Sequence, residues 1–201
     1  MNITVIGAGA WGSALAVHFA RHGNCVSLWT RSREQTAAMQ AERENKRYFP
    51  GFPFPDALTV HADPAAALNG SDLVLIVTPV AGLRNAAEQI KAAGFGSLPV
   101  LAACKGFELS TGLLPHQVLR EVLPENDKTG LLSGPSFAQE LAQQLPCAVV
   151  LAAENEAWIS SLARELNTTV LRLYANTDTV GVAVGGAVKN IMAIATGLSD
   201  G

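Results

Sequence analysis

The sequence predicts an α/β fold in which a mainly parallel, doubly wound sheet carries helices on both faces. Strand-like and helix-like segments alternate along the whole chain. The run "LVLIVTP" (73–79) is continuously apolar, as in a strand that is buried on both faces. The glycine-rich stretch "VIGAGAWG" (5–12) joins the first strand to the first helix. In such a sheet, ligands bind beyond the carboxyl ends of the strands.

The expected elements follow from periodicity and from helix-start residues. Strands are expected at 2–7, 25–30, 58–61, 73–79, 99–104, 129–133, 147–153 and 169–174. Helices are expected at 11–23, 32–46, 63–70, 80–93, 113–123, 136–144, 155–166 and from 178 onward, with Ser32 and Asp63 as N-caps. The segment 48–57 holds three prolines and three phenylalanines, which favours an ordered loop.

Composition narrows the class of protein. The chain has 201 residues, 49% of them hydrophobic, and a net charge of −3, so a sizeable core is expected and a nucleic-acid partner is not. Its three cysteines are far apart, which is typical of free thiols in a reducing compartment and argues against a metal site. The first residues lack signal-peptide features, and we expect a cytoplasmic protein without stable membrane insertion.

Gly7, Gly9 and Gly12 form a G-x-G-x-x-G pattern between a strand and a helix, which is the context of a Rossmann-like dinucleotide site. Gly7 would permit the tight turn, Gly9 the approach of a pyrophosphate, and Gly12 the close packing of helix on strand. The start of the helix offers free N–H groups to phosphates. Trp11 lies within the pattern and could cover the cofactor.

The end of the second strand bears on the choice of cofactor. An acidic residue there would bind the ribose of NAD, but the sequence reads "LWTRSRE", with no acid before Glu34. Arg31 and Arg33 could hold a 2′-phosphate through paired donors. NADP(H) is therefore the favoured cofactor, with NAD(H) left open. Alternatively, both arginines are ordinary surface residues, an interpretation that suits Arg33 better.

Three further segments carry candidate site residues. Lys105 follows a strand directly and is expected at the ligand edge of the sheet, unless it is simply a solvent-facing loop residue. In "SGPSFAQE" (133–140), Ser136 and Gln139 resemble a capping box. The local G-P-S-F-A pattern does not match the serine-nucleophile turn of hydrolases.

Lys189 is the only charged residue between Asp178 and Asp200. A buried ammonium needs a carboxylate partner if its role is structural. A half-buried lysine beside a nucleotide cleft could instead donate or accept a proton. Both interpretations stay open on the residues alone. Glycines at 181, 185 and 186 would let this helix approach the cofactor.

Several motifs in register resemble the NAD(P)-dependent glycerol-3-phosphate dehydrogenases of the bacterial type. They are "GAGAWGSALA" (7–16), "KGFE" (105–108), "SGPSFAQE" (133–140) and "GVAVGGAVKNIMAIATGLSDG" (181–201). The resemblance implies reversible hydride transfer between NAD(P)H and dihydroxyacetone phosphate, which yields sn-glycerol 3-phosphate for phospholipid synthesis.

The resemblance also implies residue roles. Lys189 would be the proton donor or acceptor, and Asn190 would lie close to the substrate. Lys105 would contact both substrate and cofactor. Further substrate contacts are implied at Gly134 and Ser136, and further cofactor contacts at Ala10, Trp11, Arg31 and Ala138.

The resemblance further implies a domain division: residues 1–177 would form the dinucleotide-binding domain, and 178–201 would open a helical substrate domain that continues in the family. We therefore expect this chain to bind dinucleotide but to catalyse poorly. Another Rossmann-like dehydrogenase of 3-hydroxyacid or opine type, a non-catalytic dinucleotide-binding module and, more weakly, a methyltransferase are the alternatives. A small-molecule substrate is expected, and a homodimer is left open.

Overall fold

The computed structural model describes residues 1–135 and 137–200, except for the side chains of 190–193 and 200. The strands are β1 Asn2–Ile6, β2 Cys25–Trp29, β3 Glu44–Asn45, β4 Phe49–Pro53, β5 Leu58–His61, β6 Leu73–Ile76, β7 Val100–Ala102, β8 Thr129–Ser133, β9 Cys147–Ala152 and β10 Leu171–Asn176. The helices are α1 Ala10–Arg21, α2 Arg33–Glu42, α3 Pro64–Leu68, the short η1 Val80–Gly82, α4 Leu83–Ala92, α5 Pro115–Val122, α6 Ala138–Ala142, α7 Glu156–Leu166 and α8 Thr179–Asp200.

The described strands form one sheet of eight strands in the order β10-β9-β8-β7-β6-β1-β2-β5, and β3 pairs with β4 separately. Every pairing in the large sheet is parallel except that between β8 and β9. The predicted mainly parallel α/β architecture is therefore confirmed. Strands β1, β6, β7 and β8 all end at the same edge, which is the edge where ligands are expected.

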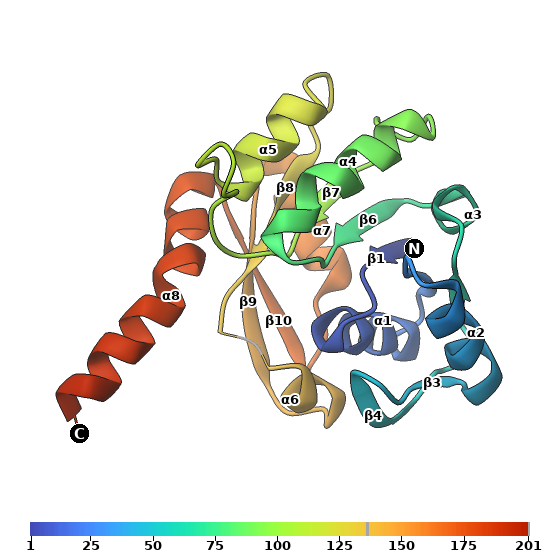
Figure 1. The fold of residues 1–201 in the computed structure, drawn as a ribbon. Coiled ribbons are helices and arrows are strands. Elements are labelled where there is room, and N and C mark those ends of the chain that lie inside the picture. The colour runs from blue at the N-terminus through green and yellow to red at the C-terminus, as the bar shows by residue number, and fades with distance from the viewer. Residues whose placement is uncertain (136, 201) are drawn as a thin grey trace.

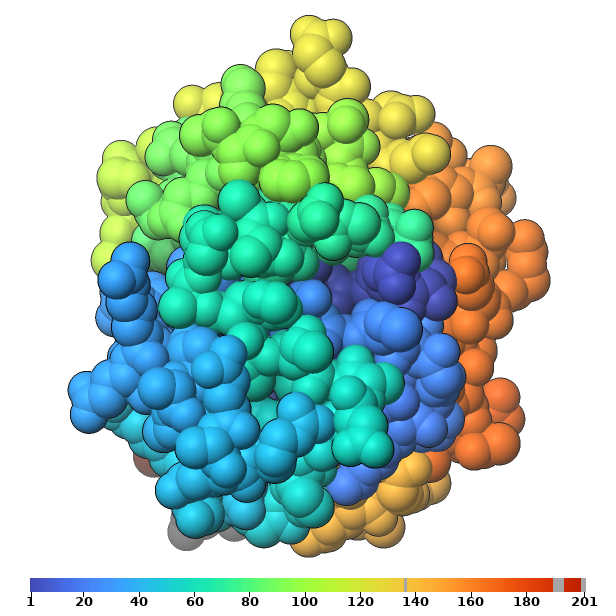
Figure 2. All heavy atoms as spheres, turned by 90° about the vertical axis from the view of Figure 1, so that its right-hand side faces the viewer, coloured from blue at the N-terminus to red at the C-terminus, as the bar shows by residue number. Residues whose placement is uncertain are grey.

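Helices cover both faces of this sheet (Figure 1). Alternate residues of β6 enter different cores: Leu73 and Leu75 pack with α1 and α7, whereas Val74 and Ile76 pack with α4 and α5. All four side chains are buried, as the unbroken apolar run predicted. Figure 2 shows one side of the molecule, where the blue and teal N-terminal segments lie below the green segment of α4.

The segment 48–57 differs from the expected loop, because part of it forms β4, which pairs with β3. The helix expected over 32–46 ends earlier, at Glu42, since Arg43 adopts the left-handed conformation with a φ of 52°. The Arg43 guanidinium donates to the carbonyl oxygens of Leu58, Phe54 and Pro55 at 2.9, 3.3 and 2.6 Å. These long-range hydrogen bonds stabilise a turn that local periodicity does not reveal. Ser32 caps α2, as predicted.

Helix α6 is shorter than the segment expected at 136–144. It begins at Ala138, and its N-cap is Phe137, which makes no side-chain capping bond. The predicted capping box depends on Ser136, which lies outside the described residues.

Helix α8 starts at the sheet edge opposite the ligand edge and packs along β8 and α5. Gly186 makes the closest approach, because a Cβ atom there would lie 2.8 Å from Ser133 Oγ and 3.5 Å from Lys105 Cγ. Gly185 has open space where a Cβ would stand. Beyond this contact the helix extends away from the sheet (Figure 1), and Ile194 and Leu198 are exposed.

The buried His18 predicts acid-sensitive stability. Its ring is 1% exposed, and burial, followed by the charges of His22 and Arg21, lowers its pKa to about 3. Because the unfolded chain binds this proton near pH 6.5, the free energy of unfolding should fall as pH drops below 6.5, by up to about 2 kcal/mol at pH 5. Denaturant titrations of His18→Gln should show a flatter pH dependence. His22→Gln removes only a secondary cause of the lowered pKa of His18 and should keep most of the wild-type slope. Equal slopes in all three proteins would contradict this account.

The two neighbouring glycines of α8 form a matched pair. Gly185→Ala should raise the free energy of unfolding by up to about 1 kcal/mol, because alanine favours helix and nothing stands in its way. The free energy of unfolding of Gly186→Ala should be at least about 1 kcal/mol lower than that of Gly185→Ala, because the new methyl group displaces either Ser133 or the helix. Chemical denaturation measures both variants, and equal stabilities would show that the contact imposes no constraint.

Candidate functional site

The glycine loop brings three backbone segments together. Gly7 has a φ of +116°, and a Cβ there would lie 2.5 Å from the carbonyl oxygen of Val77, at the end of the neighbouring strand. A Cβ on Gly12 would collide with the carbonyl oxygen of Gly7. These contacts confirm the tight turn at Gly7 and the close packing of helix on strand at Gly12. Gly9 has nothing within 4 Å of its Cβ position, so its outer side is open to a ligand.

The side-chain amides of Asn45 and Gln35 hold the glycine loop in place through hydrogen bonds. Asn45 Nδ2 donates to the Ala8 carbonyl oxygen at 2.9 Å and to Ser13 Oγ at 2.8 Å. Gln35 Nε2 donates to the same carbonyl oxygen at 3.3 Å. Asn45 is 1% exposed, so it is a structural anchor of the loop. The sequence analysis missed it, because nothing in the local pattern around Asn45 signals a contact with residues so far away in the chain.

A cavity of about 550 Å³ opens beside the glycine loop. Gly7, Gly9 and Arg31 line it, which brings three of the predicted cofactor residues together. This volume lies within the range of small-molecule pockets. The open side of Gly9, the Arg31 guanidinium and the unpaired hydroxyl of Thr78 in the cavity wall all fit a phosphate-bearing dinucleotide.

The other predicted cofactor residues lie elsewhere. Arg33 is exposed on the first turn of α2 and does not line this cavity. Ala10 and Trp11 belong to the first turn of α1, and Trp11 packs against the core. Tyr48 and Thr78, which the sequence analysis missed, line the cavity. Thr78 is the one polar residue in the run 73–79, and its position near the end of a predicted strand could have indicated a ligand contact.

Lys105 follows β7 closely, at the ligand edge. Its Nζ donates to the carbonyl oxygen of Gly134 at 2.7 Å, so it is not a solvent-facing loop residue. Burial and then the charge of Lys189 lower the pKa of Lys105 below its ordinary value, while Cys147 acts in the opposite direction. Gly134 has a φ of +146°, which turns the chain after β8 and presents this carbonyl group.

A second cavity, of about 390 Å³, brings both lysines together. It is lined by Lys105, Lys189, Gly134 and Ser133, and by glycines of α8. No described carboxylate lies within ion-pair distance of Lys189, so the described residues offer no support for a structural ion pair. Two cations that face one cavity without a carboxylate suit an anionic ligand.

The two cavities are neighbours. A Cβ on Gly106, next to Lys105, would lie 3.7 Å from Val80, and Ala81 and Gly82 line the dinucleotide-sized cavity. Chain segments that flank the two cavities therefore approach each other at η1.

The structure locates some of the remaining predicted site residues, whereas others lie outside the described part of the chain. Ala138 is half-buried at the start of α6. Asn190 belongs to α8, but its side chain, like the whole of Ser136, lies outside the described residues. Ser133 is 8% exposed and lines the smaller cavity, and it was missed although it directly precedes the predicted Gly134.

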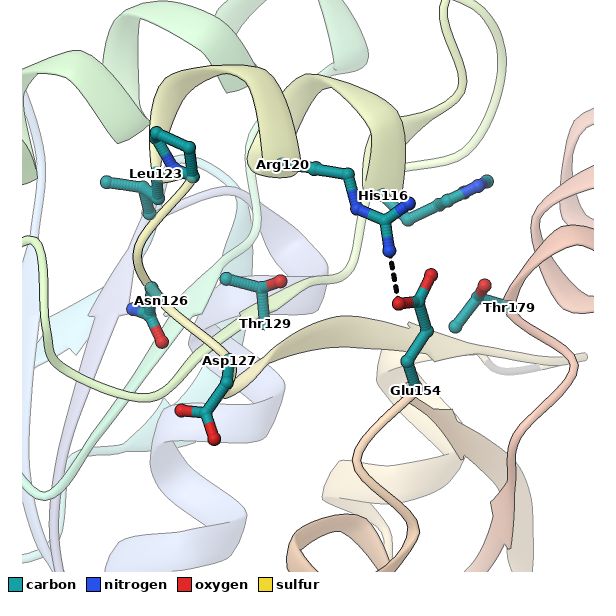
Figure 3. Close-up of a pocket in the computed structure, with 9 residues that line it drawn as sticks. His116, Arg120, Leu123, Asn126, Asp127, Thr129, Glu154 and Thr179 are labelled. Carbon is teal, nitrogen blue, oxygen red and sulfur yellow. Dashed lines mark ion pairs between the residues drawn. The ribbon is translucent and has the colours of Figure 1, made fainter.

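A further cavity, of about 220 Å³, lies at the opposite sheet edge (Figure 3). Its Arg120 forms an ion pair with Glu154 across the opening. Asp127 also lines this wall, so its carboxylates outnumber its one guanidinium, unlike the charges at the ligand edge. The described residues contain no cluster suited to a metal ion. None of their helices combines the length and the apolar character that spanning a bilayer demands.

Comparisons with known proteins agree with this fold. Over its whole length the chain is 70% identical to the glycerol-3-phosphate dehydrogenase [NAD(P)+] of Neisseria meningitidis serogroup C, and 49% identical to that of Dechloromonas aromatica. It spans 61% and 60% of these relatives. The crystal structure of glycerol-3-phosphate dehydrogenase from Coxiella burnetii matches 99% of this chain and 61% of that one, with a TM-score of 0.91 and 38% identity.

The family model for the NAD-dependent glycerol-3-phosphate dehydrogenase N-terminus matches residues 2–159, which is most of the chain. The fold, the glycine loop and the sequence relatives therefore agree, and the chain belongs to the family of NAD-dependent glycerol-3-phosphate dehydrogenase N-termini.

Proposed function

We propose that the chain binds NADP(H) at the glycine loop and serves the reversible reduction of dihydroxyacetone phosphate to sn-glycerol 3-phosphate. One observation carries this proposal: Lys105 and Lys189 face a single cavity beside the dinucleotide-sized one. The names of the relatives supply the reaction, and the two cations supply a physical reason for a phosphorylated, oxyanion-forming substrate. Phospholipid synthesis is the corresponding use of the product.

The chain's own residues divide the work as follows. A bound nicotinamide supplies or accepts the hydride. Lys189 donates the proton to the oxygen that becomes an alkoxide, and removes it in the reverse direction. Lys105 stabilises the negative charge that develops on the same oxygen or that the substrate already carries. Gly134 orients Lys105 through the hydrogen bond between them. Arg31 holds the 2′-phosphate of NADP(H), with NAD(H) as the weaker ligand.

The remaining site residues are proposed contacts of the same ligands. Gly7, Gly9, Ala10, Trp11, Gly12 and Ala138 would approach the dinucleotide, and Ser136 and Asn190 the substrate. We also propose that residues 1–177 form the dinucleotide-binding domain and that 178–201 begin a helical substrate domain. The exposure of Ile194 and Leu198 on α8 supports this boundary. The proposed location is the cytoplasm, and a homodimer is a secondary proposal.

The cofactor assignment predicts a difference between two arginines. Arg31→Ala should weaken NADPH binding at least about tenfold, because a charge-assisted bond to the 2′-phosphate is lost, while NADH binding changes little. Arg33→Ala is the matched control and should leave both affinities near the wild-type values, since Arg33 does not line the cavity. Fluorescence titration of the 201-residue chain measures all of these affinities. If Arg31→Ala weakened NADH and NADPH equally, the 2′-phosphate role would be excluded.

The substrate assignment predicts that two lysines act on one anion. Lys105→Met and Lys189→Met should each weaken the binding of dihydroxyacetone phosphate about tenfold in calorimetric titrations with NADPH present. Lys128→Met removes an exposed charge far from the cavity and serves as the control. Glycerol without phosphate should bind none of the proteins measurably. Unchanged affinity in both cavity variants would refute the proposal.

A further inference from the structure

Phe137 has an unusual position for a large apolar side chain. It is 60% exposed, so burial in the core does not account for it. It occupies the N-cap of α6, where Ser, Thr, Asp or Asn would stabilise the helix, and it makes no side-chain capping bond. Neither packing nor capping therefore explains an aromatic residue at this point.

The ring of Phe137 faces the one cation of α8. Lys189 Nζ lies 5.4 Å from the ring centroid, within the distance at which an ammonium is attracted to an aromatic face. Among the described residues, Lys189 has no ion-pair partner, and Lys105, which lines the same cavity, repels it. The aromatic ring is thus the favourable contact that the described structure gives this ammonium.

An uncharged partner has a particular advantage here. A carboxylate would restrain Lys189 but would neutralise its charge and occupy its hydrogen-bond donors. An aromatic face attracts the cation through its quadrupole and leaves the donors free for an incoming oxygen. The ring contact therefore restrains the ammonium of a cavity-lining lysine while keeping it available to an anion.

We propose that Phe137 is a positioning residue that holds the Lys189 ammonium over its ring, facing the cavity shared with Lys105. This inference rests on the proposed function for its purpose, since it presents Lys189 to the substrate oxygen. The contact itself can be measured without any substrate.

The test compares Phe137→Leu, which keeps an apolar side chain but removes the aromatic face, with Phe137→Trp, which strengthens it. The 201-residue chains are treated with acetic anhydride at one fixed pH, and the acetylation rate of each lysine is read by peptide mass spectrometry. Exposed Lys46 and Lys128 are internal controls in every sample. Thermal melting verifies that all variants fold.

Phe137→Leu should raise the acetylation rate of Lys189 about two- to fivefold, because the ammonium loses the aromatic face that restrains it. Phe137→Trp should react at or below the wild-type rate. The acetylation rates of the control lysines should not change. If Phe137→Leu, Phe137→Trp and wild type labelled Lys189 at the same rate, the proposal would be overturned.

A second readout separates this inference from the proposed function. Phe137→Leu should bind dihydroxyacetone phosphate more weakly than wild type does, whereas Phe137→Trp should bind it as tightly as wild type. If Lys189→Met binds the substrate as wild type does while the labelling difference persists, the contact stands and the substrate assignment fails. If Lys189→Met weakens substrate binding but the acetylation rate of Lys189 is the same in both Phe137 variants and wild type, only the Phe137 proposal fails.

Discussion

The site depends on one steric constraint: three backbone segments meet at the glycine loop with no side chain between them. Gly7 sits against the carbonyl group of Val77, and Gly12 sits against the carbonyl group of Gly7. This contact fixes where α1 begins relative to the end of β6. The amide of Asn45 then holds the loop carbonyl of Ala8 from the opposite side. With the loop held on both sides, Gly9 is left as an open surface, and the larger cavity forms next to it.

The smaller cavity presents the complementary electrostatic problem. Lys105 and Lys189 repel each other, and this repulsion adds to burial, the larger cause, in lowering the pKa of Lys105. A fold normally avoids such a pair or places a carboxylate between the two charges. Here a backbone carbonyl group holds one ammonium and an aromatic ring faces the other. The repulsion is therefore retained in the free protein, and an anion that enters between the cations would relieve it.

Much of the fold is readable from the sequence, because alternating periodicity and buried apolar runs are local signals. The glycine pattern predicted the tight turn between β1 and α1, and the strand-end position predicted Lys105 at the ligand edge. The pair β3–β4 was not predictable, since prolines and glycine mask the strand, and the turn before it is held by Arg43 through hydrogen bonds to distant carbonyl groups. Asn45 was missed because its hydrogen-bond partner Ala8 is far away in the sequence. The contact between Phe137 and Lys189 likewise arises from tertiary packing.

The number of residues in α8 before Lys189 determines how far along β8 its ammonium lies. Thr179 lies with Thr129 at one edge of the sheet, and Gly186 meets Ser133 at the other end of β8. The four residue steps of β8 rise roughly 13 Å, and the ten helical steps from Thr179 to Lys189 rise about 15 Å. The helix is therefore long enough to carry Lys189 past the carboxyl end of the strand. Inserting or deleting a single residue before Lys189 would move the ammonium by about 1.5 Å and rotate it by about 100°, so length matters here as much as identity.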